Sequence, residues 1–171
     1  MNLPYTIYNK GQDDIDLPYV KRDNVGREAE TYLHHIIENY NSIDGPIAFL
    51  QGDPFGHTWS GGHPNRDAVR LAISNFSDGV VLIGRSEVAM GDGSPWQPGL
   101  PISDFAKKIG VFREDECYLH SPGAQYVVSK ERIKSKPIEF WKNALDVLMS
   151  DLSKTPWAFE RLWFSMFTDN E

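Results

Sequence analysis

The sequence predicts an α/β fold, a three-layer α/β/α single domain with a mainly parallel sheet. Two short apolar runs, 47–50 and 80–83, have the length of buried strands. Each follows a segment whose apolar residues recur with helical spacing. Strands that alternate with helices form parallel sheets with right-handed crossovers. The 171 residues suit one domain, 1–171, because 40% of them are apolar and are enough to bury a core.

The expected elements follow one another along the whole chain. Helix 26–40 has an apolar face with helical spacing, and Pro137 suits the first position of a helix. Large apolar residues crowd the last helix, which predicts its deep burial. The predicted strands are 5–8, 47–50, 80–83 and 125–128, and the predicted helices are about 26–40, 66–76, 102–109, 137–152 and 155–167.

Two segments rich in Gly, Pro and Trp interrupt these elements. The segment 52–65 is long and aromatic, which is typical of a functional loop. The segment 91–101 contains Pro and Gly at positions that would break any strand ladder, so we expect a loop without regular structure. We expect both loops to close over a site as lids.

Charge and composition restrict the possible partners. The formal net charge is −7, which disfavours non-specific binding to nucleic acid. No apolar run approaches the roughly 20 residues that cross a bilayer, and no signal-peptide pattern is present. Cys117 is the single cysteine, so an internal disulfide is impossible. These features favour a cytoplasmic protein without a membrane span.

Asp53 follows the predicted strand 47–50 and is the first candidate metal ligand. Ligands of α/β folds bind where strands end and loops begin. His57 and His63 lie in the same loop, so two imidazoles and a carboxylate are one possible divalent-metal site. Asp53 alone, with Mn²⁺ or Mg²⁺ and a substrate diphosphate, is a simpler one. The structural alternative is that Asp53 only begins a turn before Pro54.

Lys10 and Arg27 are candidate anion-binding residues. Gly26 leaves the backbone N–H groups of a helix start accessible, and Arg27 adds a fixed charge there. Lys10 ends the first predicted strand, at what we expect to be the same sheet edge. Together the two cations would hold a diphosphate. The alternative is a capped helix with solvated charges.

Glu160 is the candidate catalytic residue. It lies among large apolar residues of the last helix, where an isolated buried charge is costly. Arg161 is adjacent, and adjacent helical residues do not face one another, so a partner elsewhere or a functional role is expected. Trp59, Trp96 and His57 are candidates to line a sugar or a base, with simple loop anchoring as the alternative.

Motifs spread over nearly the whole chain resemble an uncharacterised domain family described as a protein of unknown function. The resemblance brings no activity with it. The motifs are Tyr8-Asn9-Lys10-Gly11, Asn24-Val25-Gly26-Arg27-Glu28-Ala29-Glu30-Thr31-Tyr32-Leu33, Ile37-Glu38-Asn39-Tyr40, Phe49-Leu50-Gln51-Gly52-Asp53-Pro54-Phe55, Gly123-Ala124-Gln125-Tyr126-Val127-Val128-Ser129, Arg132-Ile133 and Phe159-Glu160-Arg161-Leu162-Trp163.

The block 123–129, followed by a helix and a late acidic residue, is similar to the acceptor half of nucleotide-sugar glycosyltransferases of the GT-A type. That resemblance implies a truncated GT-A-like, nucleotide-sugar-binding fold. It implies that Asp53 binds a metal on the donor diphosphate, that Glu160 is the catalytic base, and that Gln125 and Ser129 position substrate. The chain departs from the pattern because position 51 is Gln rather than Asp and because the chain is short.

These observations predict a glycosyltransferase that moves a sugar from a nucleotide-sugar donor to a hydroxyl of a glycan or protein acceptor, with Mn²⁺ or Mg²⁺ as cofactor. Two alternatives remain open. One is a metal-dependent hydrolase that uses Asp53, His57 and His63. The other is a non-catalytic carbohydrate-binding domain that uses Trp59 and Trp96.

Overall fold

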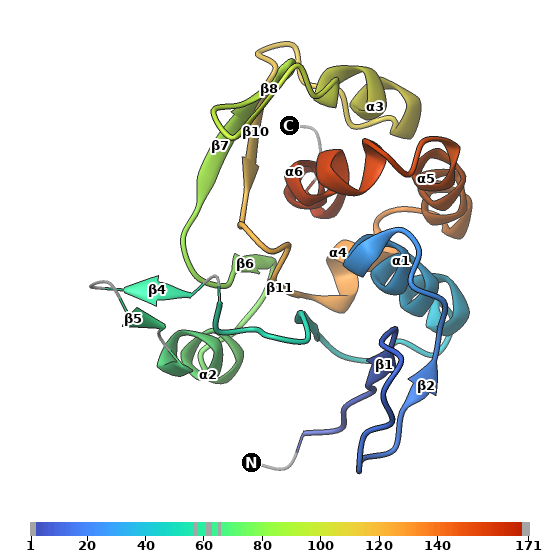
Figure 1. The fold of residues 1–171 in the computed structure, drawn as a ribbon, viewed down its shortest axis with the longest axis vertical. Coiled ribbons are helices and arrows are strands. Elements are labelled where there is room, and N and C mark those ends of the chain that lie inside the picture. The colour runs from blue at the N-terminus through green and yellow to red at the C-terminus, as the bar shows by residue number, and fades with distance from the viewer. Residues whose placement is uncertain (1–2, 57, 61–62, 65, 169–171) are drawn as a thin grey trace.

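The computed structural model describes residues 3–56, 58–60, 63–64 and 66–168, and for 59–60, 63–64 and 66 it describes the backbone alone (Figure 1). Most helices lie together on the right of the view, but helix α2 (Arg66–Ser74) lies on the left, and the strand pair of residues 8–9 and 20–21 lies on the right. In the described part of the chain, no helix is long and apolar enough to cross a membrane.

The central sheet has three strands in the order β3 (Ile47–Phe49), β11 (Tyr126–Val128) and β6 (Val80–Leu82). Strand β11 is antiparallel to both neighbours, and Tyr126 lies opposite Phe49 on one side and Leu82 on the other. All three residues of β11 are buried. A strand with neighbours on both edges and cover on both faces favours such a continuous apolar run.

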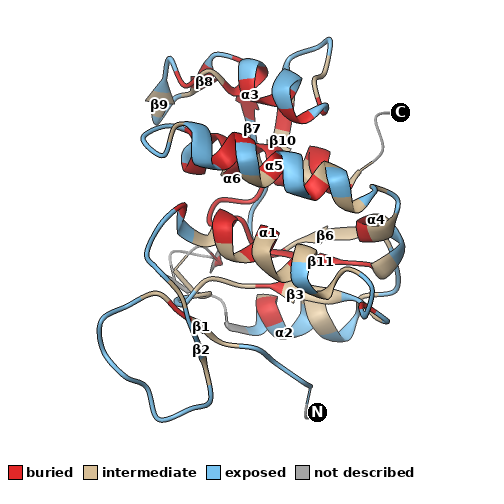
Figure 2. Cartoon of the chain, turned by 90° about the vertical axis from the view of Figure 1, so that its right-hand side faces the viewer, coloured by how far each residue is buried: buried red, intermediate tan, exposed pale blue. Residues whose placement is uncertain are grey.

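A second sheet has the order β10 (Cys117–His120), β7 (Glu87–Met90), β8 (Gly93–Ser94) and β9 (Gln97–Pro98), all antiparallel. Two further pairs are short. Strands β1 (Tyr8–Asn9) and β2 (Val20–Lys21) are parallel, whereas β4 (Trp59–Ser60) and β5 (His63–Pro64) are antiparallel. The residues between β1 and β2 form a largely exposed loop (Figure 2).

The predicted three-layer α/β/α domain with a mainly parallel, GT-A-like sheet is wrong. The described strands form small antiparallel sheets and one short parallel pair. Strands β3 and β6 do run in the same direction, as their alternation with a helix suggested. However, β11 lies between them and is antiparallel to both. Strand pairing is non-local, so the order of elements along the chain did not reveal this insertion.

The prediction that 91–101 lacks regular structure is also wrong. Strands β8 and β9 form a tight hairpin within it, with Ser94 opposite Gln97. Gly93 has φ 131°, and a Cβ there would lie 2.3 Å from the carbonyl oxygen of Gln97. Glycine therefore permits the close approach of backbones that makes the hairpin.

The predicted helices are confirmed within a few residues at each end. Helix bounds depend on local periodicity and capping, which the sequence carries directly. Helix α4 (Lys130–Lys134) was not predicted, and the Ser129 side chain accepts the Arg132 N–H at its start. The helices are α1 (Arg27–Asn39), α2 (Arg66–Ser74), α3 (Ile102–Ile109), α4 (Lys130–Lys134), α5 (Ile138–Ser150) and α6 (Thr155–Phe167).

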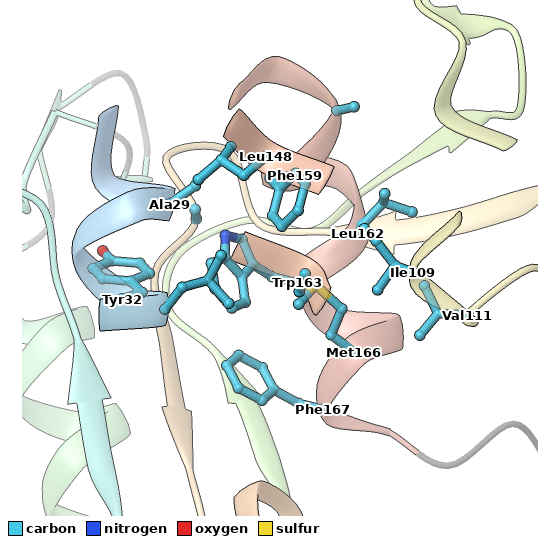
Figure 3. Close-up of a cluster of buried hydrophobic side chains, with 14 of the residues drawn as sticks. Ala29, Tyr32, Ile109, Val111, Leu148, Phe159, Leu162, Trp163, Met166 and Phe167 are labelled. Carbon is cyan, nitrogen blue, oxygen red and sulfur yellow. The ribbon is translucent and has the colours of Figure 1, made fainter. Parts of the chain in front are cut away.

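Helix α6 is the centre of the main core, as its apolar load predicts. It packs on α1, α3, α5 and β10. Figure 3 shows Trp163 of α6 between Tyr32 of α1 and Phe167. The ring centroids of Trp163 and Phe167 are 5.3 Å apart, and the planes of these two rings are nearly parallel. The ring centroids of Trp163 and Tyr32 are 5.6 Å apart. This packing brings the first turns of α1 and α6 together.

Candidate active site between helices α1 and α6

Glu160 projects from α6 towards the turn between β10 and β11. Its Oε1 atom accepts the backbone N–H of Gly123 at 2.7 Å, and its Oε2 atom accepts Arg161 Nη1 at 2.6 Å. The side chain is only 14% exposed. A carboxylate has about four lone-pair positions, so these two bonds leave one free position on each oxygen. Glu160 is thus held in place and still able to accept a proton.

The turn that holds Glu160 follows from its sequence, Ser121-Pro122-Gly123-Ala124. The Ala124 N–H donates to the Ser121 carbonyl at 2.9 Å, and Gly123 has φ 84°. Pro at the second position and Gly at the third are typical of a type II turn. The Ser121 hydroxyl also donates to the Ile83 carbonyl at 2.9 Å. The turn is buried, so the Gly123 N–H is a fixed donor.

Arg161 and His120 are the buried basic residues near Glu160. Arg161 is buried, and its Nη1 also donates to the Trp157 carbonyl at 3.0 Å. The Arg161 Nε and His120 Nδ1 atoms have no hydrogen-bond partner among the described residues. Burial lowers the pKa of His120, and the neighbouring Arg161 lowers it further. His120 is therefore a neutral imidazole near neutral pH, and its 3.9 Å approach to Glu87 is not an ion pair there.

Arg27 joins α1 to α6. Its guanidinium carbon lies 4.0 Å from the centroid of the Trp157 ring, a cation–π contact. The Arg27 side chain remains 49% exposed, and the Trp157 residue 36%. Arg27 also has φ 53°, an uncommon backbone conformation for a residue other than glycine. A strained residue with an accessible cation is a candidate for binding an anion.

Glu28 is the second carboxylate of the site. Its side chain is 15% exposed, and Arg27 Nε lies 3.7 Å from its Oε2 atom. Burial raises the pKa of Glu28, and the negative charge of Glu160 raises it further, against the lowering effects of its own backbone N–H, Arg27 and Lys10. Glu28 follows Arg27, whose guanidinium contacts Trp157 three residues before Glu160. Two carboxylates in unequal environments are typical of acid–base sites.

Lys10 lies at the start of α1 but has no free donor. Its ammonium group donates to the carbonyls of Val25 (2.5 Å) and Arg27 (2.8 Å) and to Glu30 Oε2 (2.8 Å). An ammonium group has three donors, so all are used. Glu30 also pairs with Arg22. Burial alone would raise the pKa of Glu30, but hydrogen bonds from Arg22 and Lys10 outweigh it and lower the pKa.

Gln125 holds the turn that contains Asp53. Its Nε2 donates to the Pro54 carbonyl at 2.9 Å, and its Oε1 accepts the Gln51 N–H at 3.3 Å. The Gln51 side chain donates to the Gly123 carbonyl. Since Gly123 also donates to Glu160, this chain of bonds connects the Asp53 turn with the carboxylate site. Asp53 itself is exposed, and its Oδ1 accepts the Phe55 N–H at 3.3 Å.

The other predicted site residues lie outside the pair of carboxylates. Ser129 is the N-cap of α4, and Trp96, 78% exposed, lies in the turn between β8 and β9. His57 lies outside the described residues, and so do the side chains of Trp59 and His63. The described residues include no group of three or more His, Cys, Asp or Glu side chains placed to hold a metal ion.

Two surface hollows lie apart from the carboxylates. One, about 250 Å³, lies beside the start of α1 and is lined by Lys21, Arg22, Asp23, Val25 and Glu30. The other, about 270 Å³, lies at the start of α3 and is lined by Gly91, Asp92, Gly99, Pro101, Ser103, Asp104, Lys107 and Glu116. Neither contains Glu28 or Glu160. We place the candidate site at the carboxylates because their charges and hydrogen bonds, rather than the size of a hollow, define the chemistry.

Sequence reasoning missed Glu28 and Trp157 as site residues. In the sequence, Glu28 was interpreted as an acid in the first turn of a helix, where the helix macrodipole favours a negative charge. A signal was nonetheless present, because Glu28 lies four positions before the buried Tyr32 and so shares its face of the helix. A carboxylate on a buried face is costly unless other groups compensate its charge, so Glu28 could have been singled out as Glu160 was. Trp157 was counted with the core of α6, although its ring is partly accessible.

Comparisons of this chain with models of protein families, with curated proteins and with solved structures found no match. The resemblance to an uncharacterised domain family therefore stays a prediction.

Proposed function

We propose that the chain transfers a sugar from a nucleotide-sugar donor to a hydroxyl of a glycan or protein acceptor, with Glu160 as the proton acceptor. One observation carries the proposal. The accessible guanidinium of Arg27 lies over the Trp157 ring at 4.0 Å, and the fixed carboxylate of Glu160 follows Trp157 by three residues on α6. Acid–base groups next to a cation suit transfer of a group from a phosphate leaving group.

Glu160 has the properties that a general base requires. The Gly123 N–H and Arg161 fix its orientation and stabilise its charge, while lone pairs stay free for an acceptor hydroxyl. General-base catalysis by a positioned carboxylate contributes about 10²- to 10⁴-fold in rate. We therefore expect Glu160→Gln to lower kcat by about that factor.

Arg27 is the residue that we assign to the donor diphosphate. Guanidinium groups bind phosphate through two parallel hydrogen bonds, and Arg27 is half exposed and held by Trp157. The exposed part of the Trp157 ring offers an apolar surface next to that cation. Lys10 is left out of this role because its three donors already have acceptors.

Asp53 remains the candidate ligand for Mn²⁺ or Mg²⁺. It is an exposed carboxylate, the ligand type that these ions prefer, on a turn linked through Gln51 and Gly123 to Glu160. A bound ion would neutralise charge on the donor diphosphate. The hydrolase alternative requires the imidazoles of His57 and His63, which lie outside the described side chains.

The test is a thermal-shift screen of the full chain against UDP-, GDP- and TDP-sugars, with and without Mn²⁺, followed by product detection. We expect one donor to raise the melting temperature and Arg27→Gln to weaken its binding by about 10- to 100-fold, the value of a charged hydrogen bond. Arg70→Gln, at an exposed arginine of α2, is the matched control. No shift with any donor and no product would overturn the proposal.

A non-catalytic carbohydrate-binding domain is the second candidate, favoured by Trp96. Trp96 is 78% exposed in the turn of the β8–β9 hairpin, and its aromatic face can stack on the apolar face of a sugar ring. This function predicts glycan binding that needs no nucleotide, that survives Glu160→Gln and that Trp96→Ala removes. A glycan array with both variants separates the two candidates.

A further inference from the structure

We infer that Gln51 is a positioning residue for Glu160: through the turn 121–124 it directs the Gly123 N–H at the Glu160 carboxylate. This inference rests on the proposed function and adds to it a residue that acts through the base rather than on the substrate. The evidence is a continuous series of hydrogen bonds that runs from the central sheet to Glu160.

Gly123 is held through both of its peptide groups. Its N–H donates to Glu160 Oε1 at 2.7 Å, and its carbonyl oxygen accepts a hydrogen bond from the side-chain amide of Gln51. The two peptide groups share the Gly123 Cα atom, so a displacement of the carbonyl also moves the N–H. Gln51 therefore controls the direction of a donor that fixes Glu160.

The turn needs this support because its backbone conformation is uncommon. Gly123 has φ 84°, and the next residue, Ala124, has φ 53°. A left-handed φ is unfavourable for a residue other than glycine and persists only where the surroundings determine it. Ser121 fixes the first residue of the turn through the bond of its hydroxyl to the Ile83 carbonyl at 2.9 Å. Gln51 fixes the third residue.

Gln51 is itself anchored to the central sheet. Its backbone N–H donates to Gln125 Oε1 at 3.3 Å, and Gln125 is fully buried. The Gln125 carbonyl accepts the Ile83 N–H at 3.0 Å, so its backbone extends the pairing of β11 with β6. The amide that holds Gly123 thus projects from a fixed residue. A site residue supported by such outer hydrogen bonds keeps its orientation.

The test variant is Gln51→Met, which removes the side-chain donor and keeps the length of an unbranched side chain. The bond from the backbone N–H of residue 51 to Gln125 does not depend on that side chain. Gln51→Lys keeps a donor on an unbranched side chain and should preserve the contact. Gln12→Met is the matched control, because Gln12 is exposed in the loop between β1 and β2.

The first experiment is NMR of the full chain labelled with ¹³C at proline carbonyls and ¹⁵N at glycine amides. It needs no substrate. Such labelling selects Pro-Gly pairs, and the sequence has two, Pro98-Gly99 and Pro122-Gly123. Pro98→Ala removes the Gly99 signal and so assigns the other. Gly99 then serves as the internal reference in every other variant.

We expect the Gly123 amide proton to move upfield in Glu160→Gln, because a hydrogen bond to a charged carboxylate is replaced by a weaker neutral one. It should also move upfield in Gln51→Met but not in Gln51→Lys or Gln12→Met. Adding Gln51→Met to Glu160→Gln should cause little further change. An unchanged Gly123 signal in Gln51→Met would overturn the inference, and so would the same shift in Gln51→Lys.

The second experiment measures kinetics below the melting temperature of each variant. We expect Gln51→Met to lower kcat by about 10- to 100-fold without a change in KM, since a misdirected base affects the proton transfer rather than binding. In the Glu160→Gln background the same substitution should cost nothing further. An equal loss in both backgrounds, or a rise in KM alone, would contradict the positioning role. If no nucleotide sugar reacts, the proposed function fails, whereas the NMR comparison still decides whether Gln51 places the Gly123 N–H.

Discussion

The guanidinium carbon of Arg27 lies 4.0 Å from the centroid of the Trp157 ring, and this contact joins the first turns of α1 and α6. The two residues are 130 positions apart in the chain (157 − 27). The contact places Arg27 and Glu28 on the same side of the molecule as Glu160. It is therefore the packing relationship on which the candidate site depends.

A double-mutant cycle measures this contact directly. We expect Arg27→Met and Trp157→Leu to show a coupling free energy of about 0.5–1 kcal/mol, the range for partly exposed cation–π pairs. The measurement is urea denaturation of the wild type, both single variants and the double variant. Additive effects within error would show that the ring and the cation do not interact in solution.

Replacing Glu28 should stabilise the protein at higher pH. Because the pKa of folded Glu28 is raised by burial and by Glu160, the wild type loses stability as the pH rises above the ordinary value of 4.5 through the folded pKa. Glu28→Gln has no such loss. The melting temperature of the variant relative to the wild type should increase from pH 4 to pH 8.

The matched control for this prediction is Glu38→Gln, which removes the same charge from an exposed position of α1. Its melting temperature should follow that of the wild type over the same pH range. A difference between Glu28→Gln and the wild type that is constant with pH would contradict the assigned environment of Glu28.

Glu30 should behave in the opposite way. The pKa of Glu30 is lowered because hydrogen bonds from Arg22 and Lys10 outweigh burial. The stability that Glu30 contributes is therefore fully present above its pKa in the unfolded state, and it is lost as the pH falls through its pKa in the folded state. Glu30→Gln leaves both cations without a carboxylate and should cost about 2 kcal/mol near pH 7. Urea denaturation at pH 7 and pH 3 checks this, because the gap to the wild type should shrink at pH 3.

Gly123→Ala should disturb both stability and the position of Glu160. Gly123 has φ 84°, where a Cβ costs about 1–2 kcal/mol. Its N–H is also the donor to Glu160. Thermal and urea unfolding give the stability, and Gly45→Ala is the control, because a Cβ at Gly45 meets no atom within 4 Å. Equal stability of the two alanine variants would rule out the strained turn.

The helices were predictable because a helix is specified within its own segment. The spacing of Ala29, Leu33 and Ile36 predicted α1, and Pro156 with the apolar residues after it predicted α6. Strands β7 and β10 were missed. Val88 and Met90 of β7 are exposed, so the four-residue strand has no clear alternation of buried apolar and exposed polar residues.

The candidate site was only partly predictable. Glu160 was singled out because a charge in an apolar helix requires compensation. Its compensation by Arg161 was set aside, because adjacent helical residues point in different directions. The long Arg161 side chain nevertheless reaches Glu160 Oε2 at 2.6 Å. Lys10 was predicted to bind a diphosphate, whereas it bonds to two carbonyls and Glu30 at the start of α1.

The sequence by itself determined the positions of α1, α2, α3, α5 and α6 and the burial of α6, since helical periodicity and capping depend on residues that are neighbours in the chain. Only the tertiary structure decided that β11 enters between β3 and β6, and that Arg27 contacts Trp157. Both are contacts between distant segments. Their geometry is set by how whole elements pack, which no local pattern of residues specifies.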